Sequence, residues 1–93
     1  MIGPERAKTL GLVNDVTKPG ESLQKSLDWA RAIAECSPAS VATILNVVRG
    51  GLSHADERQA LDASYTAIDE LRQHPNFVEG PLAFAEKRAP KWQ

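Results

Sequence analysis

The spacing of the large apolar residues constrains this chain more than any other feature. Along most of its length they recur every three or four positions, which places them on one side of a helix. The stretch after Pro38 is the most apolar, and a helix of this composition needs burial on more than one side. The pattern predicts an all-α fold. The strongest stripe contains Val41, Ile44, Leu45, Val48 and Leu52, broadened by Val47.

The boundaries of the helices are marked by residues with known preferences for helix ends. Ser37 followed by Pro38 is a strong start, since serine caps the first N–H groups and proline suits the first turn. Ser53 is a second cap, His74 before Pro75 marks an end, and the glycine pair at 50–51 predicts a break. We therefore expect four to five short helices in a single domain over residues 1–93. The expected elements are a short helix and extended segment over 3–17 and helices at about 21–36, 38–50, 54–73 and 80–88.

Charge and cysteine content narrow the range of partners and compartments. The net charge of −1 provides no overall field toward nucleic acid or an anionic membrane. The longest apolar run is far shorter than the roughly 20 residues of a membrane span. We therefore expect no nucleic-acid partner and no membrane partner. The one cysteine, Cys36, excludes an internal disulfide and suits the cytoplasm. We interpret it as a buried thiol near a helix end.

Residue types with catalytic or metal-binding chemistry are present, but not at useful spacings. His54, His74 and Cys36 fit no zinc pattern. The acidic residues of the predicted fourth helix are interpreted as a solvated face, because nothing beside them indicates the burial that tunes a general acid. The sequence therefore predicts no catalytic residue and no metal site. These acidic residues are Asp56, Glu57, Asp62, Asp69 and Glu70.

The C-terminal segment, residues 77–92, reads FVEGPLAFAEKRAPKW. It resembles the C-terminal signature F-x-EG-x-x-AF-x-EKR-x-P-x-[WFY] of the enoyl-CoA hydratase/isomerase (crotonase) family. Residues 6–16 are similar to that family's A-x-x-x-GLVN-x-V segment, and residues 37–39 are similar to its SP-x-A helix start. The run from Gly51 to Leu61 resembles a further family region. Because these motifs occur in the family's order, the resemblance extends over residues 3–92.

This resemblance implies a particular part of the family fold. It implies the C-terminal, trimerisation-type helical domain, without the ββα spiral core that supplies the oxyanion-binding N–H groups and the catalytic carboxylates. The chain is then expected to be inert alone, because oxyanion stabilisation is commonly the largest catalytic contribution. The parent would act on coenzyme A thioesters in fatty-acid-type metabolism, with no firmly bound cofactor.

Two residues can be carried over from the family's AF-x-EK motif, whose Phe and Lys often approach the adenine and phosphates of coenzyme A. The matching residues are Phe84 and Lys87, which a helix places on one face at i and i+3. Arg88 and Lys91 would add positive charge there. The structural alternatives are a core or interface role for Phe84 and a solvated surface role for Lys87.

Three functional hypotheses follow. The leading one is a family C-terminal domain that assembles oligomers, usually trimers, and forms part of the CoA-binding wall. The second is a stand-alone helical module that self-associates or binds a full-length relative. The third is binding of acyl-CoA or a nucleotide without catalysis. In the first two, the apolar stripes over residues 23–34, 41–52 and 61–71 are expected to form partner surfaces.

Overall fold

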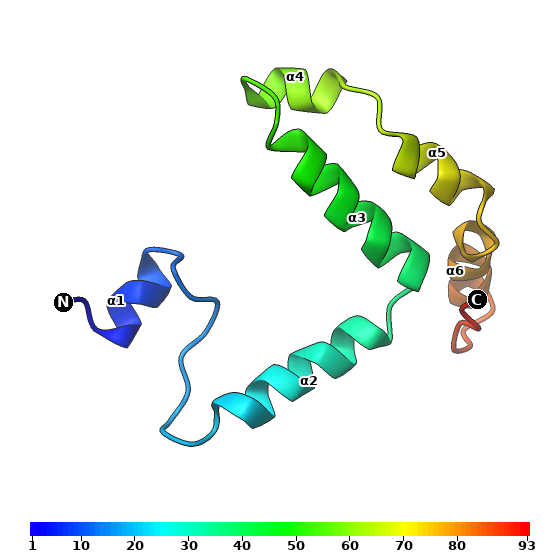
Figure 1. The fold of residues 1–93 in the computed structure, drawn as a ribbon. Coiled ribbons are helices and arrows are strands. Elements are labelled where there is room, and N and C mark those ends of the chain that lie inside the picture. Colours follow the sequence, from blue (N-terminus) through cyan, green and yellow to red (C-terminus); the bar gives the residue numbers. More distant parts are fainter. The chain divides into compact units, whose positions relative to one another are not determined.

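The computed structural model describes all residues 1–93 and contains helices but no strands. This arrangement confirms the all-α prediction. The chain divides into two compact units, Met1–Ile33 and Ala34–Gln93, which are described separately. The single domain over residues 1–93 stays a prediction. The helices are α1 (Pro4–Thr9), α2 (Ser22–Ala34), α3 (Pro38–Gly51), α4 (Glu57–Asp62), α5 (Thr66–Gln73) and α6 (Asn76–Ala85) (Figure 1).

In the first unit, an acidic side chain fastens the loop between α1 and α2. Asp15 binds the ammonium groups of Lys8 at 2.7 Å and Lys25 at 3.3 Å. Its carboxylate also accepts the N–H of Val16 at 2.9 Å. The hydrogen bond from Lys8 is the main reason that the pKa of Asp15 falls to about 2. Gly11 ends the turn after α1 with a φ of +73°, a conformation that glycine adopts without a Cβ clash.

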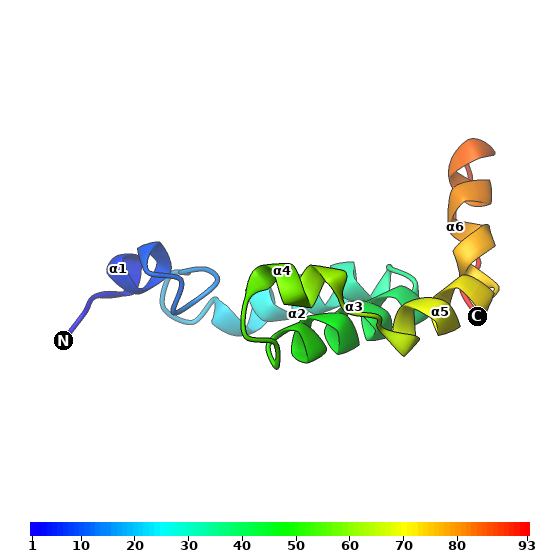
Figure 2. The ribbon, with the colours of Figure 1, turned by 90° about the horizontal axis from the view of Figure 1, so that it is seen from above.

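In the second unit, α3 and α5 lie side by side and run in opposite directions, with α4 in the connection between them (Figures 1 and 2). Ser37 caps α3 as predicted, because its Oγ accepts the N–H of Ser40 at 3.3 Å. Across the pair, the hydroxyl of Thr43 is 3.4 Å from the backbone oxygen of Ala67. Thr43 and Ala67 therefore lie at the contact between the two helices.

The aromatic ring of Tyr65 lies against the glycine pair at 50–51. Both glycines belong to the last turn of α3, which ends at Gly51. A Cβ on Gly50 would lie 3.1 Å from Cε1 of Tyr65. The Tyr65 hydroxyl donates to the backbone oxygen of Ala60 at 2.6 Å. The glycines therefore leave space for Tyr65 at the place where α3, α4 and α5 meet.

The stretch 54–73, expected as one helix, is two helices. Asp56 rather than Ser53 caps α4, because the Asp56 carboxylate accepts the N–H of Gln59 at 2.8 Å. The backbone is extended at Ala63 and again at Tyr65, which interrupts the helical hydrogen bonds. The interruption directs Tyr65 onto the α3 glycines. This packing explains why the helix is interrupted although the apolar period of the sequence is continuous.

The last helix runs from Asn76 to Ala85, earlier at both ends than the expected range 80–88, and contains Pro81 in its interior. Lys87 therefore lies outside the helix, and the expected helical i and i+3 placement with Phe84 was wrong. Nδ1 of His74 accepts the N–H of Asn76 at 3.2 Å, which provides one of the first helical N–H groups with a partner. Pro81 has no backbone N–H, so the helix lacks one backbone hydrogen bond at this position. Figure 2 shows α6 running across the ends of α3 and α5.

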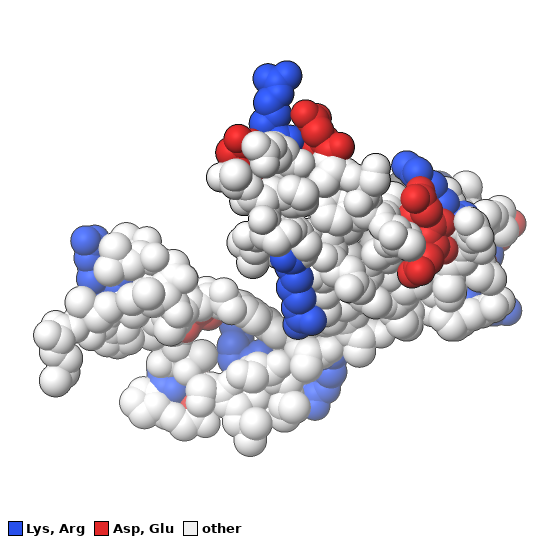
Figure 3. Space-filling model, turned by 45° about the horizontal axis from the view of Figure 1, so that its top comes forward, with Lys and Arg blue, Asp and Glu red and all other residues white.

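Most large apolar side chains remain exposed. Ala83, at 1% exposure, is the one buried hydrophobic residue. On α3, most of the predicted stripe faces solvent, with Val48 at 58% and Leu52 at 82% exposure, whereas Val41 and Val47 are half-buried. The helix also packs against α5. Figure 3 shows small separate groups of charge with wide uncharged surface between them. The stripes over 23–34 and 41–52 are thus largely exposed, whereas in the stripe over 61–71 Leu61 is exposed and Tyr65, Ile68 and Leu71 are half-buried.

Two further features bear on the sequence predictions. Cys36, interpreted as buried, is exposed, because it lies in the short connection between α2 and α3 rather than under a packed helix. None of the helices combines the length and apolar character that crossing a membrane requires.

Candidate functional site

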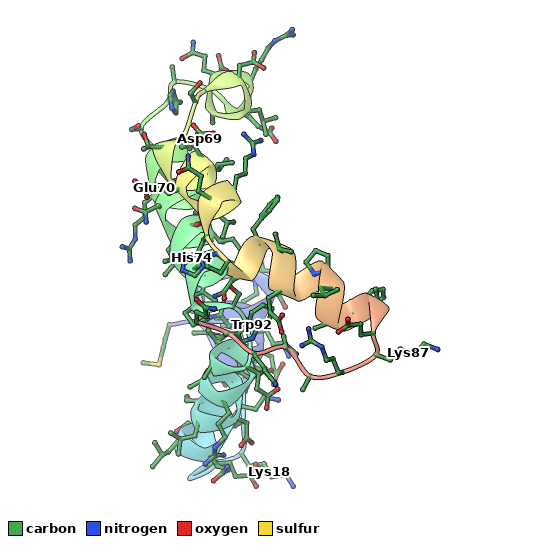
Figure 4. The ribbon with its side chains drawn as sticks, turned by 90° about the vertical axis from the view of Figure 1, so that its right-hand side faces the viewer. Lys18, Asp69, Glu70, His74, Lys87 and Trp92 are labelled. Carbon is green, nitrogen blue, oxygen red and sulfur yellow. The ribbon has the colours of Figure 1, made fainter.

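The candidate site is the C-terminal end of α6 and the tail that follows it. Residues 86–93 turn at the end of α6 and run back along the helix, as Figure 4 shows from Lys87 to Trp92. The reversal uses two backbone bonds: the N–H of Lys87 binds the oxygen of Phe84 at 3.2 Å, and that of Arg88 binds the oxygen of Ala83 at 3.0 Å. These bonds define a Schellman motif, the common ending of helices.

Lys87 occupies the left-handed position of this motif, with a φ of +53°. Glycine is the usual residue there, because a Cβ clashes with the backbone when φ is positive. A non-glycine residue in this region carries roughly 1–3 kcal/mol of strain. The lysine is therefore held in place by the contacts of its neighbours.

The nearest such contact is an ion pair between Glu79 and Arg88. Nη1 of Arg88 donates to Oε1 of Glu79 at 2.6 Å, and Nη2 donates to Oε2 at 3.1 Å. Oε1 also accepts the backbone N–H of Lys91 at 2.6 Å. The Arg88 hydrogen bonds, followed by that of Lys91, lower the pKa of Glu79 to about 2. The same pairing raises the pKa of Arg88, so the pair stays charged across the ordinary pH range.

Two more side chains fasten the end of the tail. The buried amide of Asn76, 3% exposed, donates to Ser37 Oγ at 3.2 Å and to the backbone oxygen of Gln93 at 3.1 Å, and it accepts the N–H of Gln93 at 2.9 Å. The indole N–H of Trp92 binds the backbone oxygen of Glu35 at 2.8 Å. The indole ring lies over Gly80, where an added Cβ would be 3.4 Å from Cη2 of Trp92. The tail thereby joins α6 to the connection before α3.

The two residues predicted to contact CoA, Phe84 and Lys87, take no part in the side-chain contacts that hold the tail against α6. Phe84 is 87% exposed on α6. Lys87 is exposed at the turn, with its side chain directed away from the rest of the unit (Figure 4). Arg88, considered as additional positive charge, is instead neutralised by Glu79 and by Glu86, whose Oε2 lies 2.6 Å from Nε of Arg88.

Sequence reasoning missed the roles of Glu79 and Asn76. The one available signal for Glu79 was that it belongs to the quoted C-terminal signature, where it precedes Gly80. Asn76 had no comparable signal, because its partners lie 39 and 17 residues away in the sequence.

The other candidate residues have structural surroundings. His54 meets Tyr65 edge-on with ring centroids 6.3 Å apart, and His74 accepts the bond from Asn76. Asp69 pairs with Arg72 at 3.1 Å on the exposed side of α5. No three His, Cys, Asp or Glu residues converge as a metal site would require.

The first unit contains an open hollow of about 430 Å³ between the loop at 14–17 and α2. Trp29 and Ile33 form its apolar wall, and the paired charges of Asp15 and Lys25 form its polar edge. Because these two charges neutralise each other, the hollow offers no unpaired charge from this pair for recognising a ligand.

Comparison with known proteins places these features in a family context. The sequence model described as enoyl-CoA hydratase/isomerase matches residues 1–93. The carnitinyl-CoA dehydratase of Salmonella arizonae is 34% identical over 95 residues, which cover 96% of this chain and 35% of that protein. The enoyl-CoA hydratase EchA19 of Mycobacterium tuberculosis is 36% identical over 92 residues, covering 99% of this chain and 34% of that protein.

Solved structures show the same partial coverage. An enoyl-CoA hydratase/isomerase from Mycobacterium paratuberculosis matches with a TM-score of 0.90 and 26% identity, over 99% of this chain and 36% of that chain. An enoyl-CoA hydratase from Polaromonas matches with a TM-score of 0.84 and 29% identity, over 99% of this chain and 35% of that chain. The chain thus spans about a third of the length of the relatives it matches, in agreement with the C-terminal region expected from the motifs.

Proposed function

The chain belongs to the enoyl-CoA hydratase/isomerase family, and we propose that it serves as the helical region through which copies of the parent protein assemble. In the same proposal, the exposed end of α6 forms part of the wall of a CoA site. The chain by itself is catalytically inert, and chemistry on an acyl-CoA thioester belongs to the parent protein.

The observation that carries the assembly role is the uncovered apolar face of α3. Ile44, Leu45, Val48 and Leu52 are all exposed, although the helix already packs its other face against α5. Burying each such side chain contributes about 1.5–3 kcal/mol. Large uncovered apolar patches usually mark partner surfaces. The face is therefore suited to contact with another copy of the family fold.

The CoA role is supported by the two unused residues of the C-terminal signature. An exposed phenyl ring at Phe84 offers a face on which adenine can stack, and the ammonium of Lys87 offers a point charge for a phosphate. Phe84 lies in the last turn of α6 and Lys87 follows two residues after the helix end, so the proposal requires one ligand to reach both. Most of the ligand surface would be buried by other parts of the assembly, since one helix end covers too little of it.

Inertness alone is supported by the surroundings of the acidic residues. The carboxylates of Asp62 and Asp69 are mostly exposed and pair with Arg58 and Arg72. Neither is placed in a pocket that would tune it for proton transfer. We therefore assign the thioester chemistry to groups outside these helices.

Assembly and activity are tested together on the purified chain. Light scattering after size exclusion should show a multimer, with a trimer expected from the family, and crotonyl-CoA should not turn over above background. A monodisperse monomer at high concentration would contradict the assembly role. Turnover above background would contradict inertness.

The stand-alone module is the second candidate, and the same exposed faces support it. The two candidates differ in the mass of the protein in its source cells. A species of 10.1 kDa, detected with an antibody to residues 79–92, would favour the stand-alone module. A species about three times longer, as in the relatives, would favour the parent enzyme.

A further inference from the structure

The turn after α6 contains a lysine at a position where glycine would be less strained. Lys87 is the one non-glycine residue of the chain with a positive φ. Strained backbone conformations of this kind concentrate at functional sites, where the surrounding structure over-determines them. The turn itself does not require a lysine, so the side chain is the feature of this residue to consider.

The contacts of the residues that follow Lys87 explain how the strained conformation persists. Arg88, the next residue, is bound by both oxygens of Glu79, which lies on α6 itself. The N–H of Lys91, farther along the tail, binds the same carboxylate. A bidentate arginine–carboxylate pair restricts direction as well as distance. Glu79 therefore holds the chain on the far side of the turn against the helix from which it came.

We propose that Glu79 is a positioning residue for Lys87: by binding Arg88 and the Lys91 N–H it holds the left-handed turn and directs the Lys87 ammonium toward a phosphate of the CoA moiety. This inference rests on the proposed CoA role of Lys87. It adds that the neighbouring cation, Arg88, holds the turn in place and does not itself bind the phosphate. Neutralising Arg88 leaves Lys87 as the unpaired cation of the turn.

Preorganisation is the physical benefit. A lysine side chain on a flexible terminus loses conformational freedom when it binds an anion, and that loss weakens binding. A turn already fixed by Glu79 reduces the loss. The backbone of residue 87 then needs no rearrangement when the phosphate arrives, and the strain is present before binding as well as after it.

The test is a double-mutant cycle of Glu79→Gln and Lys87→Ala in the native assembly that contains residues 1–93. Isothermal titration calorimetry measures affinity for CoA and for pantetheine, which lacks the nucleotide phosphates. Lys87→Ala should weaken CoA binding about tenfold or more, in the range of a charged hydrogen bond, and leave pantetheine binding unchanged. Glu79→Gln should weaken CoA binding several-fold, and it should have no further effect once Lys87 is alanine.

Two additional variants make the result specific. Asp69→Asn breaks a surface ion pair on α5 and should leave CoA affinity unchanged, as a matched control for the loss of a carboxylate. Lys87→Gly should raise the melting temperature, because it relieves the positive φ, and should weaken CoA binding as much as Lys87→Ala. If Glu79→Gln fails to fold, Arg88→Lys takes its place in the cycle, because lysine keeps the charge and loses the bidentate geometry.

The outcomes separate this inference from the proposed function. Additive losses from Glu79→Gln and Lys87→Ala would overturn the positioning role and leave the CoA role of Lys87 standing. Unchanged CoA affinity in Lys87→Ala would overturn both. A change in assembly mass with Lys87→Gly, with CoA affinity unaltered, would assign the lysine to contact between copies and would also overturn both.

Discussion

Glu79 and Arg88 lie nine residues apart and face each other through two parallel hydrogen bonds, of 2.6 Å between Nη1 and Oε1 and 3.1 Å between Nη2 and Oε2. The pair closes the C-terminal tail onto α6 and leaves both oxygens of the carboxylate occupied. It gives most of the C-terminal signature a structural role. Glu79 and Arg88 bind each other, Gly80 leaves space for the Trp92 ring, and Ala83 is buried.

Acid should release the tail. The pKa of Glu79 lies at about 2 in the folded chain against an ordinary value of 4.5, chiefly because Arg88 donates to it. Since the folded-state pKa is the lower one, the stabilisation is complete above the ordinary value and is lost as the pH falls through about 2. Fluorescence of Trp92, followed in a Trp29→Phe background, should therefore change between about pH 4.5 and pH 2.

The same titration on Glu79→Gln provides the control for the acid experiment. Glutamine has no carboxylate to protonate, so this variant should lack the fluorescence change in that pH window. An identical change with glutamine at position 79 would show that another group releases the tail. Asp15, whose pKa is also lowered to about 2 by Lys8, is kept in this variant, so a signal that arises from Asp15 would remain.

Removing the Ser37 hydroxyl should weaken the second unit. Its oxygen caps α3 and also accepts the buried amide of Asn76. Ser37→Ala should lower the free energy of unfolding by about 1–3 kcal/mol, because it removes the cap and leaves Asn76 with an unmet donor. Thermal unfolding followed by circular dichroism measures the loss. Ser53→Ala, which removes one exposed bond to Gly50, should be nearly neutral; equal losses would contradict the special role of Ser37.

The two glycines at the end of α3 should respond differently to alanine. A Cβ on Gly50 would be 3.1 Å from the Tyr65 ring, whereas one on Gly51 would have its nearest neighbour at 3.6 Å. Gly51→Ala should be neutral or stabilising by up to about 1 kcal/mol, from helix propensity. Gly50→Ala should be less stable than Gly51→Ala, because the ring must shift. Chemical denaturation compares the two, and the reverse order would contradict the packing of Tyr65 on Gly50.

A charge on the uncovered face of α3 should weaken assembly without unfolding the helix. Val48→Glu places a carboxylate in the proposed interface, where the loss of about 1.5–3 kcal/mol corresponds to a tenfold or greater rise in the dissociation constant. Analytical ultracentrifugation measures the constant. Asn46→Glu, on the polar side of the same helix, is the matched control and should leave it unchanged. Equal effects of the two changes would exclude this face from the interface.

The sequence anticipated those elements whose signals are local. Ser37 and Pro38 begin α3 as predicted, because capping acts within the first turn of the helix. The single helix expected over 54–73 shows the limit of such reasoning. Leu61, Tyr65 and Ile68 keep a helical period, yet Tyr65 leaves the helix to fill the space above Gly50. The competing contact lies 15 residues earlier in the sequence, beyond the reach of any periodicity argument.

For the candidate site, the motif resemblance identified Phe84 and Lys87 as the residues to consider, and the tertiary structure showed what surrounds them. The left-handed backbone conformation of Lys87 could not be predicted from its residue type, because lysine is also common in helices. The bond between Trp92 and Glu35 joins residues 57 apart. No sequence pattern at that separation indicates which carbonyl an indole will find.

The amino-acid sequence by itself determined the helical class and the start of α3, because periodicity, caps and prolines act over a few neighbouring residues, and its motifs carried the family resemblance. Only the tertiary structure decided which face of α3 is covered, where the helical period breaks, and that Glu79, Asn76 and Trp92 fold the tail back onto α6. Those outcomes depend on contacts between residues 9 to 57 positions apart. Such contacts form through packing and hydrogen-bond geometry in three dimensions, which no local preference specifies.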